Sequence, residues 1–287
     1  MELTEGSIIK VLPGGEKLLW GGTRRGVKLS RPVEAGTLFD PDKTKCPFHR
    51  DDEKSLAEYH NGEIRVLSNV FTPHKNHRLV IARDCSDEWF VRTLGGPEFL
   101  ATCMEAIGTI ASHDGEELAL GVHVLRGQNV PHLHWHVYGY WKEEELDLAR
   151  ETEWTRPEEN PDLFVISSEN FSVVARGPKV GQLILIPSGG EPLSLLDHHA
   201  EVAGLLYDLV YRTNRAFVST QGEMPRYTIS GRCSADGKLR YFLYTPELQM
   251  LGCSDDLADL NGTARARTWS PKETAKYLVE NILSSID

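Results

Sequence analysis

The order of hydrophobic and polar positions along this chain occurs twice. Short runs rich in β-branched residues and ended by turn formers predict strands, and apolar residues at every third or fourth position predict amphipathic helices. In the first half these patterns predict two strands, a helix that begins at Pro97 and packs on the sheet, and two more strands. The predicted strands cover residues 63–71, 77–84, 118–127 and 133–141.

The same order of elements follows in the second half. It predicts two strands, a helix and two strands at residues 170–177, 182–188, 195–214, 226–232 and 239–246. Ser270, Pro271 and Glu273 form a capping box with proline at the first helical position, which predicts a final helix. The repeated order predicts an α+β protein of two related halves, residues 1–155 and 156–287.

Composition and charge narrow the possible partners. The 287 residues are 40% apolar and 25% charged, which is typical of a globular protein. A net charge of −11 without a cluster of Lys and Arg argues against nucleic acid as a main partner. Neither a signal-peptide pattern nor an apolar run of about 20 residues is present, so we expect a cytoplasmic protein without a membrane partner. Five cysteines favour metal ligation or burial over a disulfide framework.

One predicted strand carries histidine at every second position, in the sequence PHLHWHVYG at residues 131–139. Because strand side chains alternate between faces, His132, His134 and His136 share one face, and the apolar residues between them share the other. Three imidazoles on one face have no packing rationale, since each ring carries polar nitrogens that need partners. The pattern leaves two chemistries open: a three-histidine metal site, or covalent catalysis by one imidazole at phosphorus.

The residues before this strand favour covalent catalysis. Gly127, Gln128 and Asn129 precede it, and small or amide-bearing residues in such a turn can present N–H donors to an anion. A strand that only binds a metal ion does not require such a turn. The same residues are therefore candidates for binding a phosphate group of the substrate.

The sequence GQNVPHLHWHV resembles the signature of the histidine triad superfamily. HRLVIARD resembles the strand that precedes the helix of that family, and CPFH followed by IRVLSNVF resembles the opening of its galactose-1-phosphate uridylyltransferase branch. In the second half, NFSVVARGPKVGQLILIPS and WSPKETAKYL also fit this branch. The resemblance implies two histidine-triad-like half-barrels, each an antiparallel sheet with a packed helix.

The resemblance also implies roles for individual residues. His134 matches the nucleophile that attacks the α-phosphorus of a nucleotide and forms a covalent nucleotidyl-histidine. His136 would lie beside the phosphate, where it could stabilise charge or protonate the leaving group. Gln128 and Asn129 would contact phosphate oxygens, and Asn69 matches a position that touches the nucleoside.

A structural zinc site is a further implication of the family. His132 matches a zinc ligand, Cys46 and His49 occupy the positions of the C-x2-C pair, and Cys85 stands where relatives carry histidine. Two thiolates and two imidazoles suit a closed tetrahedral zinc site. We expect Cys103 to be a core residue and His77 to belong to a polar turn.

One departure from the family leaves the reaction open. The uridylyltransferase branch has glutamine where this chain has His136, and histidine there is commoner among the hydrolases of the superfamily. The whole-chain architecture favours transfer or phosphorolysis of a nucleotide or nucleotide sugar, and His136 favours hydrolysis of dinucleotides or phosphoramidates. A metal-dependent enzyme with a three-histidine ion and a non-catalytic nucleotide-binding protein are the other classes. Relatives commonly form homodimers, so a homodimer is an expectation too.

Overall fold

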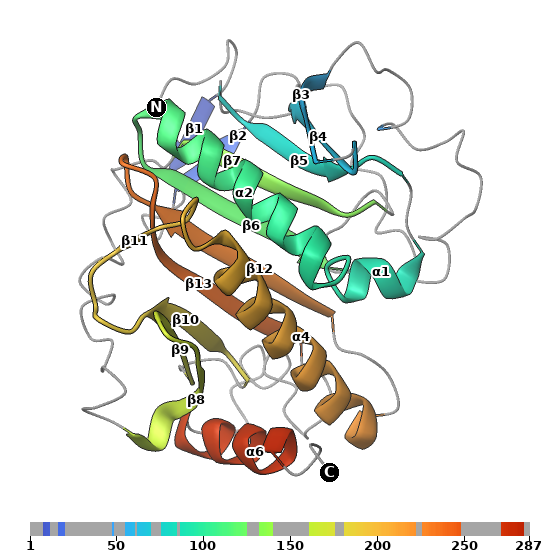
Figure 1. Cartoon of the computed structure of the whole chain (residues 1–287), viewed down its shortest axis with the longest axis vertical. Helices are drawn as coiled ribbons and strands as arrows, with labels where there is room; N and C mark the ends of the chain where they lie inside the picture. The colour runs from blue at the N-terminus through green and yellow to red at the C-terminus, as the bar shows by residue number, and fades with distance from the viewer. Residues whose placement is uncertain are drawn as a thin grey trace.

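The computed structural model describes twelve stretches of the chain. Their helices and strands are drawn in Figure 1. They are residues 8–11, 17–20, 48, 55–60, 62–69, 76–84, 87–124, 132–139, 161–175, 181–221, 226–247 and 271–283. All structural statements below concern these residues.

The first half forms five neighbouring antiparallel strands. They are β3 (Ser55–Tyr59), β4 (Ile64–Ser68), β5 (Arg78–Ala82), β6 (Leu118–Val124) and β7 (His134–Gly139). Their order in the sheet is β3-β4-β5-β7-β6, so the histidine strand β7 lies between β5 and β6. A separate pair, β1 (Ile8–Val11) and β2 (Lys17–Trp20), forms a two-stranded sheet.

The second half repeats this arrangement. Its strands are β8 (Phe164–Ser167), β9 (Phe171–Ala175), β10 (Leu183–Pro187), β12 (Arg226–Cys233) and β13 (Lys238–Glu247), with the short β11 (Leu193–Ser194) paired to β13. A 3₁₀ helix, η7 (Pro161–Leu163), precedes β8. From edge to centre the order is β8-β9-β10-β13-β12, which matches the first half strand for strand.

The two halves join edge to edge through β6 and β12. Antiparallel pairing runs from Tyr227 opposite Val124 to Cys233 opposite Leu118, and α2 also contacts α4 across this junction. Within the described residues the result is one eleven-stranded antiparallel sheet. The predicted α+β class is confirmed, and the two predicted sheets are parts of one continuous sheet.

Helices cover one face of this sheet (Figure 1). They are α1 (Glu88–Arg92), α2 (Pro97–Asp114), α4 (His199–Gln221) and α6 (Pro271–Leu283). The main core lies between these helices and the sheet, where Trp135, Leu100 and Leu278 are fully buried. The opposite face carries two smaller apolar clusters, one in each half. The histidines of β7 therefore lie on the face away from the helices.

The strands, helices and core predicted from periodicity are largely confirmed. The helix predicted from Pro97 and the final helix at Pro271 both begin at these residues, and Cys103 is buried as expected. The local patterns missed β3, β8 and α1, which are each five residues or fewer. Residue 155, the predicted boundary, lies outside the described residues. None of the described helices has the length and apolar character that crossing a membrane requires.

Candidate active site

The position of β7 in the sheet explains the two faces of its alternating sequence. Trp135 and Val137 are fully buried against the helix side, whereas His134, His136 and Tyr138 are half-buried on the other side. In the register with β5, His134 lies opposite Ile81 and His136 opposite Leu79. One face of β7 therefore belongs to the core and the other face to the candidate site, as the alternation of side chains along a strand predicts.

His134 has the protonation pattern of a nucleophile. Its Nδ1 atom lies 2.7 Å from the carbonyl oxygen of His132, and because a carbonyl only accepts, Nδ1 carries the proton and donates it. In the neutral ring Nε2 then has a lone pair. Burial lowers the pKa of His134; the hydrogen bond to the His132 carbonyl acts in the opposite direction, and the nearby charge of His123 adds to the lowering. The ring therefore stays neutral at physiological pH.

His136 belongs to a cluster of imidazole rings. Its Nδ1 atom lies 2.9 Å from Nε2 of His77, and the ring centroids of these two residues are 5.1 Å apart. The His134 ring lies 4.9 Å away and the His123 ring 6.2 Å away. The amide nitrogen of Asn69 is 3.4 Å from each ring nitrogen of His77. The predicted nucleoside-contacting residue and the predicted acid or base are therefore connected through His77.

The contacts of His132 fix which of its ring nitrogens carries the proton. This residue is fully buried, and its Nε2 donates to the carbonyl oxygen of Ala82, which leaves Nδ1 as the nitrogen with a lone pair. Phe48 packs its ring against His132, with the centroids 5.3 Å apart. Phe48 is part of the C-x2-H segment, and Ala82 is three residues before Cys85. Phe48 and Ala82 thus both contact His132, and the predicted ligands Cys46, His49 and Cys85 lie outside the described residues.

Phe48 also closes one side of the histidine strand. Its ring lies 5.5 Å from the His134 ring and packs on an apolar cluster of Leu67, Leu79 and Ile81 on β4 and β5. The side chain of Arg65 on β4 donates to the carbonyl oxygen of Phe48 over 2.6 Å. These contacts fix Phe48 over β4 and β5.

The structure brings together four of the ten predicted site residues. Asn69, His132, His134 and His136 lie on two nearby parts of one sheet face. The other six predicted residues lie outside the described residues, and their roles stay predictions: Cys46, His49, Cys85, Gly127, Gln128 and Asn129. Among the described side chains, no group of three or more His, Cys, Asp and Glu is arranged to hold a metal ion.

Two histidines of this cluster were missed in the sequence. His77 was expected in a polar turn, and this prediction was wrong: the side chain is buried and contacts His136. It directly precedes β5, the neighbour of β7, so only the strand pairing brings it to the site. His123 carried a local signal, because it lies on the face of β6 opposite the buried Leu118, Leu120, Val122 and Val124.

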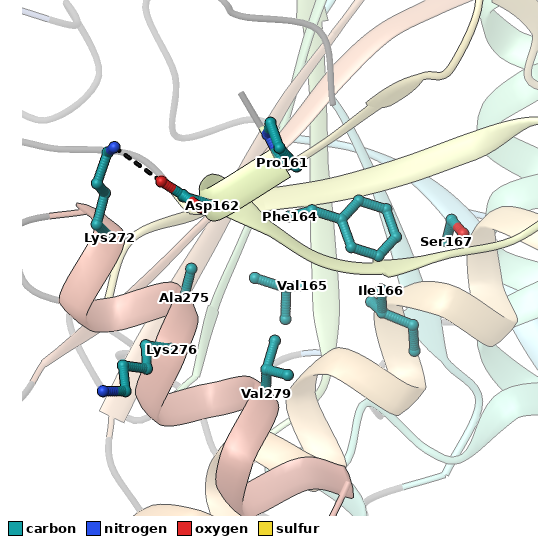
Figure 2. Close-up of a pocket in the computed structure, with 10 residues that line it drawn as sticks. All are labelled: Pro161, Asp162, Phe164, Val165, Ile166, Ser167, Lys272, Ala275, Lys276 and Val279. Carbon is teal, nitrogen blue, oxygen red and sulfur yellow. Dashed lines mark hydrogen bonds and ion pairs between the residues drawn. The ribbon is translucent and has the colours of Figure 1, made fainter. Parts of the chain in front are cut away.

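A groove of about 740 Å³ lies elsewhere, between η7, β8 and the first turns of α6 (Figure 2). Phe164, Val165 and Val279 give it an apolar wall, and an ion pair of 2.9 Å joins Lys272 to Asp162 at its rim. The ten residues that line this groove include neither histidine nor cysteine. It is therefore separate from the histidine cluster.

Comparisons with known proteins support the fold. No protein-family model matches the chain, and no curated protein sequence does. Among solved structures, a uridylyltransferase superposes with a TM-score of 0.66 at 13% sequence identity, covering 97% of this chain and 99% of that chain. An ADP-glucose phosphorylase from Arabidopsis thaliana, solved with bound ADP-glucose, gives a TM-score of 0.53 at 15% identity, covering 96% and 99%.

A third similar structure is the Ap4A phosphorylase from yeast in complex with Ap4A, with a TM-score of 0.51 at 14% identity over 84% of this chain and 73% of that chain. Across most of its length the chain therefore has the fold of these uridylyltransferases and phosphorylases. The fold that the resemblance implies, an antiparallel sheet with a packed helix in each half, is therefore confirmed.

Proposed function

We propose that the protein is a nucleotidyltransferase or nucleotide phosphorylase that works through a covalent intermediate on His134. The observation that carries this proposal is the hydrogen bond from Nδ1 of His134 to the carbonyl of His132, because it leaves the lone pair on Nε2. The fold supports the same class of reaction, since similar structures are named as a uridylyltransferase and two phosphorylases.

The reaction has two displacements at the same phosphorus atom. In the first, the Nε2 lone pair of His134 forms a bond to the α-phosphorus, and the bond from phosphorus to the bridging oxygen breaks. That oxygen keeps the bonding electron pair and leaves with the departing phosphate ester. In the second, an oxygen of phosphate or of a phosphate ester attacks the α-phosphorus and displaces Nε2 of His134. The ring returns to its neutral form and starts the next cycle.

In this reaction His136 would serve the leaving group. Its ring lies 4.9 Å from that of His134 on the same face, and its Nδ1 contacts His77. If His77 Nε2–H donates in this contact, the proton of a neutral His136 is on Nε2, where it can donate to a bridging oxygen. Gly127, Gln128 and Asn129 would bind the phosphate oxygens, and Asn69 the nucleoside, as the family resemblance implies.

A structural zinc ion fits the donor set of the first half. Cys46, His49, Cys85 and His132 supply two thiolates and two imidazoles, which suit tetrahedral zinc. His132 donates Nε2–H to the Ala82 carbonyl, and zinc-ligating histidines commonly donate their second N–H in this way. Such an ion would hold the C-x2-H segment against β7 and take no part in the two displacements.

Hydrolysis is the second candidate function, and His136 favours it. A second imidazole contacted by His77 can act as general base for water in place of a phosphate acceptor. The substrates would then be dinucleotides or nucleoside phosphoramidates. Both candidates share the covalent step on His134.

The decisive experiment traps the intermediate. The protein is incubated with a panel of nucleotides, nucleotide sugars and dinucleotides, and the intact mass is measured for an added nucleotidyl group. We expect the adduct in the wild type and its loss in His134→Ala, with His113→Ala as a control because His113 lies at the exposed end of α2. A folded wild-type protein that gains no mass from any substrate would refute both candidates. Release of the nucleotidyl group from His134 by phosphate would indicate a transferase or phosphorylase, and release by water would indicate a hydrolase.

A further inference from the structure

The histidine strand borders a strip of small and polar residues that crosses the junction between the two halves. Gly121 of β6 lies opposite His136 of β7 on one side and opposite Ser230 of β12 on the other. Two pairs along, Thr228 of β12 lies opposite His123 of β6. Because side chains of directly opposed residues share a face, these four residues continue the face that carries His136.

The described residues leave the junction strip partly exposed. His123 and Ser230 are exposed, and Gly121 and Thr228 are half-buried. Among the described residues, a Cβ atom at Gly121 would meet only the Ile229 carbonyl oxygen, at 3.6 Å, which is an ordinary van der Waals contact. As far as the described part of the chain extends, there is therefore space above Gly121, next to His136 on the neighbouring strand.

The other side of the histidine strand is closed. Phe48 covers Leu67, Leu79 and Ile81 on β4 and β5 and packs against the His134 ring at 5.5 Å. A substrate that extends from the α-phosphorus along this face therefore meets an aromatic side chain in one direction. In the other direction it meets Gly121 and then Ser230.

We propose that this junction strip is the subsite for the part of the substrate beyond the α-phosphate, a sugar phosphate or a similar phosphate ester with hydroxyl groups. The hydroxyl groups of Thr228 and Ser230 can donate to and accept from sugar hydroxyls, and the imidazole of His123 can bind the departing phosphate. The absence of a side chain at Gly121 lets this group lie across β6. The inference rests on the proposed covalent reaction at His134.

The junction strip gives the second half of the chain a part in the reaction. β12 belongs to that half, so Thr228 and Ser230 reach the site only because β6 and β12 pair. The group that leaves in the first displacement and the acceptor of the second would occupy the same subsite. Within the junction strip, His123 is close to the histidine cluster, because its ring is 6.2 Å from that of His136.

The test compares donors with small and large leaving groups. Uridine and adenosine 5′-phosphorimidazolides carry only imidazole beyond the α-phosphorus, whereas UDP-glucose and ADP-glucose carry glucose phosphate. The rate of covalent labelling is measured by intact mass for each donor. In Gly121→Leu we expect the ratio of the nucleotide-sugar rate to the imidazolide rate to fall at least tenfold. Gly189→Leu is the matched control, since Gly189 is exposed in a turn with open space around it, and its ratio should equal that of the wild type.

Two further variants test the same subsite in case Gly121→Leu does not fold. Ser230→Leu should lower the same ratio, and His123→Ala should lower the nucleotide-sugar rate more than the imidazolide rate. An unchanged ratio in all three folded variants, or an equal loss for both donors, would overturn the subsite. If the wild type is labelled by neither donor class, the proposed covalent reaction is wrong. If the wild type is labelled but the substitutions in the junction strip leave the ratio of rates unchanged, only the subsite is wrong.

Discussion

Nε2 of His77 lies 2.9 Å from Nδ1 of His136, and the two residues are 59 positions apart in the chain. The side chain of His77 is buried, and the amide nitrogen of Asn69 lies 3.4 Å from each of its two ring nitrogens. An amide nitrogen only donates, so a donation to Nδ1 of His77 places the proton of that ring on Nε2. His77 would then donate to Nδ1 of His136 and hold the proton of His136 on Nε2.

The first prediction concerns this pair. His77→Ala should lower kcat by roughly 10- to 100-fold, a part of the ~10²–10⁴-fold that a positioned acid or base contributes. His77→Gln should recover most of the loss, because its amide can again donate to Nδ1 of His136. Nitrogen-15 NMR of the histidine side chains reports the tautomer directly. If the His136 tautomer is the same in the wild type and in His77→Ala, His77 does not position it.

The second prediction concerns pH. Burial lowers the pKa of His134 below its usual value of 6.5, so the unfolded chain takes up a proton as the pH falls through 6.5 while the folded protein does not. The contribution of His134 to the free energy of unfolding is therefore full above pH 6.5 and decreases as the pH falls from 6.5 towards the folded-state pKa. Urea unfolding between about pH 5 and pH 7.5 measures this slope. His134→Gln should show a smaller slope in this window; an identical slope would contradict the lowered pKa.

The third prediction concerns zinc. We expect about one zinc ion per chain, lost in Cys46→Ser and retained in His134→Ala. Removal of the ion with a chelator should lower the thermal midpoint of the wild type and leave that of Cys46→Ser unchanged. Metal content by mass spectrometry and thermal unfolding are the two measurements. Loss of the metal in His134→Ala would instead point to an ion held by the three histidines of the motif.

The fourth prediction compares two glycines in helices. A Cβ atom at Gly108 of α2 would lie 2.8 Å from the backbone nitrogen of Leu196, whereas one at Gly204 of α4 would meet nothing within 4 Å. Alanine is favoured over glycine by about 1 kcal/mol in a helix interior. Gly204→Ala should therefore raise the urea midpoint and Gly108→Ala should lower it, because the backbone of Leu196 must move. A rise in both variants would show that α2 and the start of α4 are less tightly packed.

The sequence predicted most where the information is local. The alternation in β7 identified its histidine face and its buried Trp135 and Val137, and the periodic pattern after Pro97 identified α2 and the burial of Cys103. The roles of His134 and His136 came from the resemblance and stay predictions. Local patterns also gave the repeated order of elements, which the sheet reproduces strand for strand.

What the sequence could not provide depends on contacts between distant segments. The contact of His77 with His136 requires that β5 pair with β7, and the junction strip requires that β6 pair with β12, more than 100 residues away. No periodicity encodes which strand edges meet. Short elements such as α1 and β8 carry too few residues for a period to be recognised.

The pairing of β6 with β12 has a consequence for how the protein unfolds. These two strands are the innermost of the sheet, and α2 and α4, which contact each other, belong to the helix layer that covers it. Separating the halves would break the ladder at the centre of the molecule and expose the largest core at the same time. The slowest amide hydrogen exchange should therefore occur at this joint, and the outer strands β3 and β8 should exchange first. The repeat that is visible in the sequence would then unfold as a single cooperative unit.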